Sequence, residues 1–421
     1  MSQQMNASIK TQAVYQLKEI AKELKRLGAE SKVLERPSSG QNFMHDHVWI
    51  YISAEGLEKH EQLILFLYKN GWSDKFSEKY LDDKLRSVYA RYVQAPSDEM
   101  LAGCLKEIAD EYESYRKEHI VIVPLAGIVL ENDSVGLGNI ILRKATPEYL
   151  KKRILISAEE LPDELVNDFI QDVLKGRSET VCAEYKIVAE QDRAEERAID
   201  ECNRTLDVLR FAIPVLDLPH LKIAIGFEHE KPEKDWLHTY ILEVGNNQKR
   251  SGSDKNFSFF PLKLNADSIV TLDGIGALKL FAALKKERLT DFEQVLLRGV
   301  HWYSTSQKTI EPENKFLNLI TCLETFFTPK TRDPIANAVA EGCAFVLCEE
   351  AEKRKLIYRR VKQFYGARSG LSHGGKTAVL ESEIKEAEWI AWHVIVSLLA
   401  KLDNFQTQEA LWAWIEEQKF N

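Results

Sequence analysis

The sequence predicts a multidomain α+β protein that ends in an all-α helical bundle. Three observations carry this prediction. The chain has 421 residues, which is long for a single hydrophobic core. Strand-like runs of β-branched residues begin near residue 120, after a mainly helical start. From about residue 288 onward, successive segments show only helical spacing of apolar residues. We therefore expect a mainly helical region over 1–118, a mixed α/β region over 119–286 and a helical bundle over 287–421.

The first region is expected to hold four helices and one strand. Leu17, Ile20 and Leu24 follow a helical spacing, and Gly28 is a typical residue to end that helix. Residues 48–53 read Val-Trp-Ile-Tyr-Ile-Ser, which is the β-branched and aromatic composition of a strand. The helices are predicted over residues 9–27, 57–68, 80–92 and 100–115.

The second region alternates between strand and turn signals. The run 120–130 is the most apolar of the chain, and Pro124 is expected to break it. Residues 181–190 alternate apolar and polar side chains, whereas 194–211 have helical spacing. Further strands are predicted over residues 139–142, 221–227, 238–244 and 257–264.

The third region contains five amphipathic segments and a short tail. In the last long segment Ile384, Ala387, Ala391 and Ile395 share one broad apolar face, and such faces pack together in a bundle. The helices are predicted over residues 292–306, 314–327, 335–350, 352–368, 381–402 and 411–417.

Composition excludes several classes of protein. No run reaches the ~18 apolar residues that span a membrane, and the first residues lack the basic and apolar segments of a signal peptide. A cytoplasmic protein without membrane contact is therefore expected. The six cysteines show neither a Cys-x-x-Cys pair nor a zinc-ligand spacing, so we expect free and mostly buried thiols.

Charge is distributed unevenly along the chain. The net charge is −9, which argues against a protein that binds nucleic acid over its whole surface. Residues 288–421 contain 17 basic and 18 acidic residues and are therefore nearly neutral. The segment from Lys353 to Arg368 contains seven basic residues and no acidic one. A polyanion contact is expected on this segment.

Arg368 and His373 form the candidate site. Arg368 extends an apolar stripe that includes Val361 and Phe364, where a guanidinium needs a carboxylate partner. Glu324 lies beside the apolar face of an earlier helix and is the partner we predict. Five residues of helix separate Arg368 from His373 by about 140°, so one regular helix does not direct both at a single group. Taken alone, the pair fits a structural ion pair and a helix cap better than a catalytic site.

A family resemblance changes that balance. The run Phe364-Tyr365-x-x-Arg368-Ser369-x-x-x-His373-Gly374 resembles the signature of HEPN domains of the Apea-like branch. Residues 315–327, with Glu324, are similar to the early core helix of that branch. The resemblance covers about residues 288–421. Ser369 stands directly after the arginine, where many catalytic HEPN proteins have Asn, Asp or His.

The resemblance implies RNA cleavage without a metal or cofactor. RNA carries its own nucleophile, the 2′-hydroxyl group, so the protein moves protons and stabilises the phosphate. A histidine suits the first task and an arginine the second. The implied catalytic residues are Arg368, His373 and Glu324. The expected contacts to single-stranded RNA come from Lys355, Arg359, Lys362, Tyr365 and Ser369, and Tyr358 is a further candidate for stacking on a base.

Because one regular helix does not direct Arg368 and His373 at one phosphate, we also expect a homodimer through residues 288–421, with the two site helices meeting at a two-fold axis. Phage defence or a toxin-like growth arrest is the implied setting, and the first 286 residues would sense a phage-derived or cellular trigger. The alternative is a non-catalytic HEPN dimer that binds nucleic acid or serves as a scaffold or regulator, and Ser369 keeps it open.

Other histidine and aromatic clusters have simpler interpretations. His45-Asp46-His47 places two imidazoles on one face of a possible strand, which resembles a metal site. No third ligand stands at a suitable spacing, so an ordinary polar edge is the preferred interpretation. The clusters at residues 301–303 and 389–393 are expected to be aromatic residues of the bundle core or rim.

Overall fold

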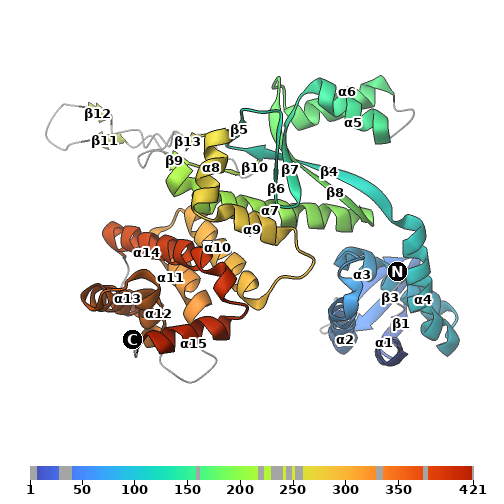
Figure 1. The fold of residues 1–421 in the computed structure, drawn as a ribbon. Coiled ribbons are helices and arrows are strands. Elements are labelled where there is room, and N and C mark those ends of the chain that lie inside the picture. The colour runs from blue at the N-terminus through green and yellow to red at the C-terminus, as the bar shows by residue number, and fades with distance from the viewer. Residues whose placement is uncertain are drawn as a thin grey trace. The chain divides into compact units, whose positions relative to one another are not determined.

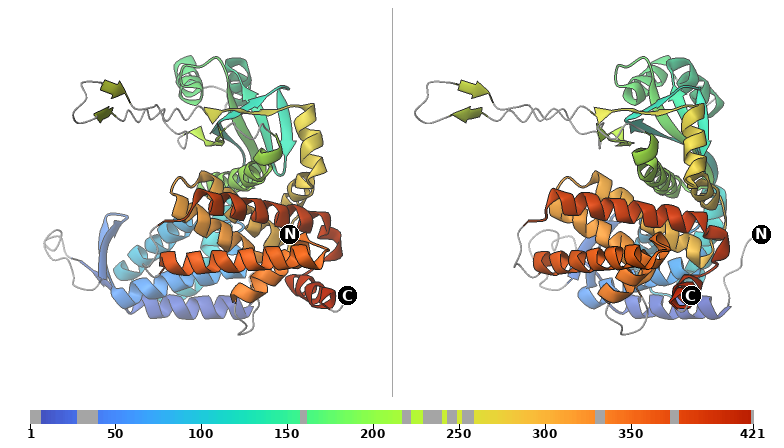
Figure 2. Two further views of the ribbon diagram at one scale, coloured as in Figure 1. Left: turned by 90° about the vertical axis from the view of Figure 1, so that its left-hand side faces the viewer. Right: turned by 60° about the vertical axis from the view of Figure 1, so that its left-hand side comes forward.

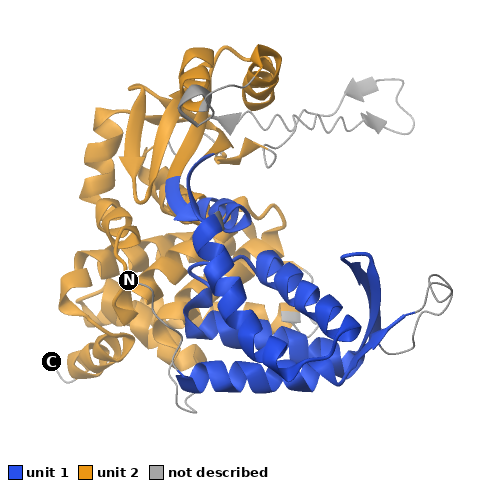
Figure 3. Ribbon diagram, turned by 90° about the vertical axis from the view of Figure 1, so that its right-hand side faces the viewer, with its two compact units in different colours: residues 1–121, 186–199 blue, residues 122–185, 200–421 orange. Residues whose placement is uncertain are grey.

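The protein is a mixed α+β structure whose C-terminal region is entirely helical from α10 to α15. The computed structural model describes residues 7–27, 40–157, 162–216, 222–228, 240–242, 249–251, 259–328, 335–372 and 378–419 (Figure 1). The chain forms two compact units, one of residues 1–121 and 186–199 and the other of residues 122–185 and 200–421 (Figure 3). This division differs from the three regions expected from composition, because the expected boundary near residue 286 lies inside the second unit.

The first unit combines helices with a small antiparallel sheet of order β1-β3-β2. Three of its helices begin after a serine, at positions 53, 77 and 97, whose hydroxyl accepts a backbone N–H of the first turn. Its elements are α1 (Ala7–Ala21), β1 (Leu24–Arg26), β2 (Gly40–His45), β3 (Val48–Ser53), α2 (Ala54–Leu67), α3 (Glu78–Gln94) and α4 (Asp98–Tyr115).

The strand prediction for residues 48–53 is confirmed at both ends, whereas the first helix is shorter than predicted. It ends at Ala21, and Leu24–Arg26 instead pairs with β3, with Leu24 opposite Ile52. The helical spacing of Leu24 was misleading because β3 offers unpaired backbone groups that a neighbouring strand satisfies. Gly28, predicted to end the helix, lies outside the described residues.

The run His45-Asp46-His47, expected to be a polar strand edge, contains a hairpin turn. Asp46 and His47 connect β2 to β3 with φ values of 47° and 64°, while His45 pairs with Val48 at the strand ends. Two consecutive residues with positive φ are the signature of a tight hairpin turn. The two histidines therefore do not share a strand face, and the described residues contain no group of side chains that could hold a metal ion.

A five-stranded sheet of order β10-β4-β8-β7-β6 and the helix that follows it lie mostly in the second unit, although residues 117–121 and 186–199 of these elements belong to the first. Leu142 and Ala183 are paired on the face that joins the main core, whereas Arg143 and Cys182 are paired on the other face. The elements up to the long helix are β4 (Lys117–Ala126), β5 (Ile128–Leu130), β6 (Ser134–Leu137), β7 (Ile140–Ala145), α5 (Pro147–Ser157), α6 (Asp163–Leu174), β8 (Thr180–Ala189) and α7 (Gln191–Leu216).

Short strands and two helices follow α7. They are β9 (Lys222–Ile223), β10 (Gly226–Phe227), β11 (Tyr240–Leu242), β12 (Lys249–Ser251), β13 (Phe259–Phe260), β14 (Leu262–Leu264), α8 (Ala266–Gly274) and α9 (Ala277–Leu284). The predicted break at Pro124 was wrong: Pro124 lies within β4, and the chain bends at Gly127, whose φ is 75°. Strand β6 and helices α5, α6, α8 and α9 were not predicted.

The helical region of the second unit agrees closely with the predicted helices. Its members are α10 (Asp291–Lys308), α11 (Pro312–Phe327), α12 (Ile335–Leu347), α13 (Ala351–Ser372), α14 (Glu381–Ala400) and α15 (Gln408–Gln418). Figures 1 and 2 show α10 to α15 gathered into one bundle. Helix α13 continues through Gly370 to Ser372, four residues beyond the predicted end.

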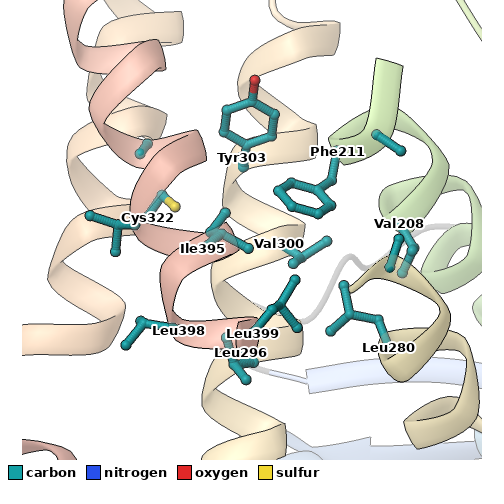
Figure 4. Packing of buried hydrophobic residues seen from close by; sticks show 14 of the residues in the cluster. Val208, Phe211, Leu280, Leu296, Val300, Tyr303, Cys322, Ile395, Leu398 and Leu399 are labelled. Atoms are coloured by element: carbon teal, nitrogen blue, oxygen red, sulfur yellow. The ribbon is translucent and has the colours of Figure 1, made fainter. Parts of the chain in front are cut away.

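One hydrophobic core joins this bundle to α7, α9 and the sheet. Figure 4 shows Phe211 of α7 beside Tyr303 and Val300 of α10, with Ile395 of α14 on the opposite side. The Phe211 and Tyr303 rings meet edge to face with centroids 6.0 Å apart. Because the α10–α15 helices share this core with the preceding elements, they do not form a separate hydrophobic core.

Candidate functional site

The candidate site lies where α13 packs beside α11. Val361, Phe364 and Ala367 form the buried face of α13. Arg368 lies at the edge of that face, and 38% of its side chain is exposed. The apolar stripe therefore continues through Ala367, and Arg368, which was expected to continue it, is half-buried at its edge. The reason is that an α-helix has 3.6 residues per turn. One turn after Phe364, the buried face therefore falls between positions 367 and 368.

The predicted pairing of Glu324 with Arg368 is confirmed. The Nη1 atom of Arg368 donates a hydrogen bond of 2.8 Å to Oε1 of Glu324. The Glu324 side chain is only 16% exposed, because it sits beside the buried face of α11. A carboxylate in this position holds the guanidinium in one orientation.

Tyr365, expected as an RNA contact, is a third member of this cluster, and the sequence did not reveal its link to Glu324. Its hydroxyl donates to the same Glu324 oxygen at 3.0 Å, and the Arg368 Cζ atom lies 5.9 Å from its ring centroid. Burial and the neighbouring Glu324 charge raise the pKa of Tyr365, so the phenol stays protonated and remains a donor. Glu324, Tyr365 and Arg368 thus form a positioned carboxylate–phenol–guanidinium cluster. The position of Tyr365 one helical turn before Arg368 was the sequence signal that could have predicted this cluster.

The remaining predicted RNA contacts form one exposed stripe on α13. Spacings of four, three and seven residues place them within about 80° of arc on a helix. All of them are solvent-exposed. The members are Lys355, Arg359, Lys362 and Ser369.

Part of the positive charge on α13 is neutralised. Lys355 pairs with Glu352 one turn earlier, at 2.7 Å, and Arg360 pairs with Glu386 of α14. Lys362 donates to the Asn337 side chain. Arg359 has no carboxylate partner within the described part of the chain. The stripe therefore carries less free charge than its composition suggests.

The stripe and the arginine face different sides of α13. Helical geometry separates Arg368 from each stripe residue by at least about 100°. His373, the predicted acid–base residue, lies outside the described residues. The structure thus brings together Arg368, Glu324 and Tyr365, and it separates them from Lys355, Arg359 and Lys362.

The clusters at residues 301–303 and 389–393, which contain histidine and aromatic side chains, lie only partly in the core. Tyr303 is buried, and Trp392 donates its indole N–H to the carbonyl of Phe211. Trp389 is half exposed and packs against His393 in a tilted arrangement, with ring centroids 4.0 Å apart. His301 is exposed and binds Asp207 of α7, a contact that the sequence did not indicate.

Comparison with known proteins adds no identification: no family model, curated protein or solved structure matches the chain. Among the helices that the structure describes, none is long and apolar enough to cross a membrane. All six cysteines are free and five are buried, which confirms the prediction of free, mostly buried thiols.

Proposed function

We propose that this protein is a metal-independent endoribonuclease and that α10–α15 form a HEPN-type bundle of the Apea-like branch. The observation that supports it is the Glu324–Arg368 pair, in which Glu324 accepts from one guanidinium nitrogen. The other N–H groups of Arg368 have no partner among the described residues, and the side chain reaches solvent. A guanidinium held in this way can bind a phosphate through two parallel hydrogen bonds.

The chemistry follows from the RNA itself. The 2′-hydroxyl attacks the adjacent phosphorus, and the bond to the 5′-oxygen of the next nucleotide breaks. Arg368 stabilises the negative charge that develops on the phosphate oxygens. His373, by resemblance, takes the proton from the 2′-hydroxyl or gives one to the leaving oxygen. Glu324 and Tyr365 act as positioning residues for Arg368.

A homodimer is part of this proposal. Arg368 and the stripe of Lys355, Arg359 and Lys362 face different sides of one α13, so a single chain does not direct both at one phosphate. A two-fold axis near the end of α13 brings a second copy of each into reach, and two-fold dimers are the commonest closed assembly. The implied setting is phage defence or a toxin-like growth arrest, with the first 286 residues receiving the trigger.

The central test is RNA cleavage in a chelator. Purified full-length protein is incubated with labelled single-stranded RNA in EDTA, with and without candidate triggers. Cleavage is expected to persist in EDTA and to be lost in His373→Ala. Arg368→Lys keeps the charge but loses the planar fork, so most activity should be lost with normal folding. The matched control is Arg360→Lys on the same helix, which should cleave like the wild type.

The second candidate function is a non-catalytic HEPN dimer that binds nucleic acid or acts as a scaffold. Ser369 favours it, because many catalytic members carry Asn, Asp or His after the arginine. RNA binding without cleavage under every trigger would support this function. Arg368→Lys activity equal to that of the wild type would show instead that the phosphate clamp is misassigned.

The dimer is tested on the full chain, because the C-terminal helices share their core with α7 and the sheet. Light scattering should give twice the mass of one chain. Excess His373→Ala protein mixed with wild type should lower activity beyond simple dilution if each cleft uses residues of both copies. A monomer with full ribonuclease activity would contradict this assembly.

A further inference from the structure

A second basic stripe lies on α10, on residues that the proposed catalytic cluster does not use. Positions 294, 298, 301, 305 and 308 follow spacings of four and three and fall within about 80° of arc. They are Gln294, Arg298, His301, Thr305 and Lys308, and none of the fifteen residues from 294 to 308 is acidic. Arg298, His301 and Lys308 are exposed.

The permanent charges of this stripe are not neutralised. Neither Arg298 nor Lys308 has a carboxylate within ion-pair distance among the described residues. On the α13 stripe, by contrast, Lys355 is paired with Glu352 and Lys362 donates to Asn337, which leaves only Arg359 without a partner among the described residues. The α10 stripe is therefore a better electrostatic partner for a polyanion than composition alone indicated.

His301 is held in place by a buried polar cluster. Its Nδ1 atom lies 2.8 Å from Oδ2 of Asp207, while more than half of its side chain is exposed. Asp207 is buried, and its other oxygen accepts from Ser304 at 2.5 Å and from Arg210 at 3.3 Å. Arg210 is itself buried and donates twice to the carbonyl of Ile225. This network fixes the imidazole with Nε2 free to meet a ligand.

The charge balance of the cluster favours an anion at Nε2. The Asp207 carboxylate is already balanced by Arg210, so a protonated His301 adds a net positive charge at the surface. The hydrogen bond from His301 to Asp207 raises the pKa of the imidazole, while Lys308 and Arg210 act in the opposite direction. A protonated His301 presents an N–H donor on the same face of α10 as Arg298 and Lys308.

We propose that Arg298, His301 and Lys308 form a binding surface for the phosphate backbone of single-stranded RNA. This inference rests on the proposed function and extends it, because the surface is separate from the Glu324–Arg368 cluster. The three side chains span about 15 Å along the helix. A stacked strand rises about 3.4 Å per nucleotide, so the stripe matches a run of about four nucleotides.

The test is the salt dependence of binding. Full-length protein carrying His373→Ala, which prevents cleavage, is titrated with a fluorescein-labelled single-stranded oligouridine at pH 6.0 and 50–200 mM salt. Three phosphate contacts contribute about 2 to the slope of log affinity against log salt. The triple variant Arg298→Gln, His301→Gln, Lys308→Gln should lose that contribution. Wild-type affinity should therefore fall about 20-fold more than variant affinity across this range.

Two controls separate this surface from general charge effects. Lys263→Gln with Lys285→Gln removes two exposed charges elsewhere in the same unit and should leave the slope unchanged. His301→Gln alone should weaken binding more at pH 6.0 than at pH 8.5, because the protonated fraction of the imidazole falls as the pH rises. The urea midpoint of each variant checks that the fold is intact.

The outcomes distinguish the two proposals. If the protein without the stripe substitutions binds RNA and the triple variant keeps the same slope, the α10 surface is refuted while the ribonuclease proposal stands. If the otherwise unsubstituted chain neither binds nor cleaves RNA, both proposals fail. A loss of slope in the triple variant, with the control pair unchanged, supports the inference.

Discussion

Gly299→Ala in α10 should destabilise the second unit, because α11 lies directly against this glycine. A Cβ atom added at position 299 would lie 2.0 Å from Cζ of Phe326 and 2.8 Å from both Cε atoms. Carbon atoms in contact are normally about 3.5–4.0 Å apart. Phe326 is fully buried, so its ring cannot move into solvent. Either the ring or the two helices must shift by more than an ångström.

The expected change in the free energy of unfolding is the difference between two opposing effects. Overpacking a core costs about 1–3 kcal/mol, and a contact this short belongs at the upper end of that range. Replacing glycine by alanine inside a helix stabilises the helix by about 1 kcal/mol. The net loss of unfolding free energy should therefore be about 2 kcal/mol. Gly342→Ala, whose Cβ would lie 2.2 Å from the Phe327 ring, should behave in the same way.

The matched control is Gly366→Ala in α13. No atom lies within 4 Å of the added Cβ, and the position is exposed, so only the helix-propensity gain remains. It should stabilise the protein by about 0.5–1 kcal/mol. Urea unfolding followed by tryptophan fluorescence measures both changes. Wild-type stability in Gly299→Ala would refute the close packing of α10 on α11, and a loss of stability in Gly366→Ala would show that this surface is covered.

Three further predictions use the same unfolding assay or simple labelling. Glu324→Gln should lower stability by about 1 kcal/mol, since the pair with Arg368 is partly exposed, and a double-mutant cycle that finds no coupling would contradict the pairing. The pKa of His301 is raised in the folded state, so its stabilisation is complete below the ordinary pKa near 6.5 and is lost as pH rises through the folded value. His301→Gln should accordingly cost more stability at pH 5.5 than at pH 8.5, and an equal cost at both would argue against the link to Asp207. A thiol reagent should label only Cys348 in the native protein, because the other five thiols are buried and covered. Burial raises the pKa of Cys348 as well, so its labelling should be slow at neutral pH; rapid labelling of more than one thiol would show an open core.

Local sequence patterns were sufficient for the long regular elements. The period-2 run at 48–53 and the 3.6-residue periods of α10, α11 and α14 fixed the identity of each element, because one face of each is buried continuously. They were also enough to pair Glu324 with Arg368. Both residues lie beside an apolar stripe, and a half-buried guanidinium requires a carboxylate.

The same patterns failed where a distant segment decides the structure. Leu24 fits a helical stripe, yet residues 24–26 form a strand because the edge of β3 supplies hydrogen-bond partners. The run His45-Asp46-His47 was expected to be an ordinary polar edge of a strand, yet Asp46 and His47 form the turn that joins β2 and β3. Propensity is a weak guide once backbone groups of another strand compete for the same residues.

The sequence by itself determined which residues face inward on the long helices of the C-terminal region, and it singled out Glu324 as the partner of Arg368. Only the tertiary structure decided the other polar contacts. Tyr365 joins Glu324 across 41 residues of sequence, and Asp207 reaches His301 across 94. Periodicity gives the direction of a side chain relative to its own helix axis. The identity of its partner depends on how two helices pack, which the periodicity of either helix alone does not contain.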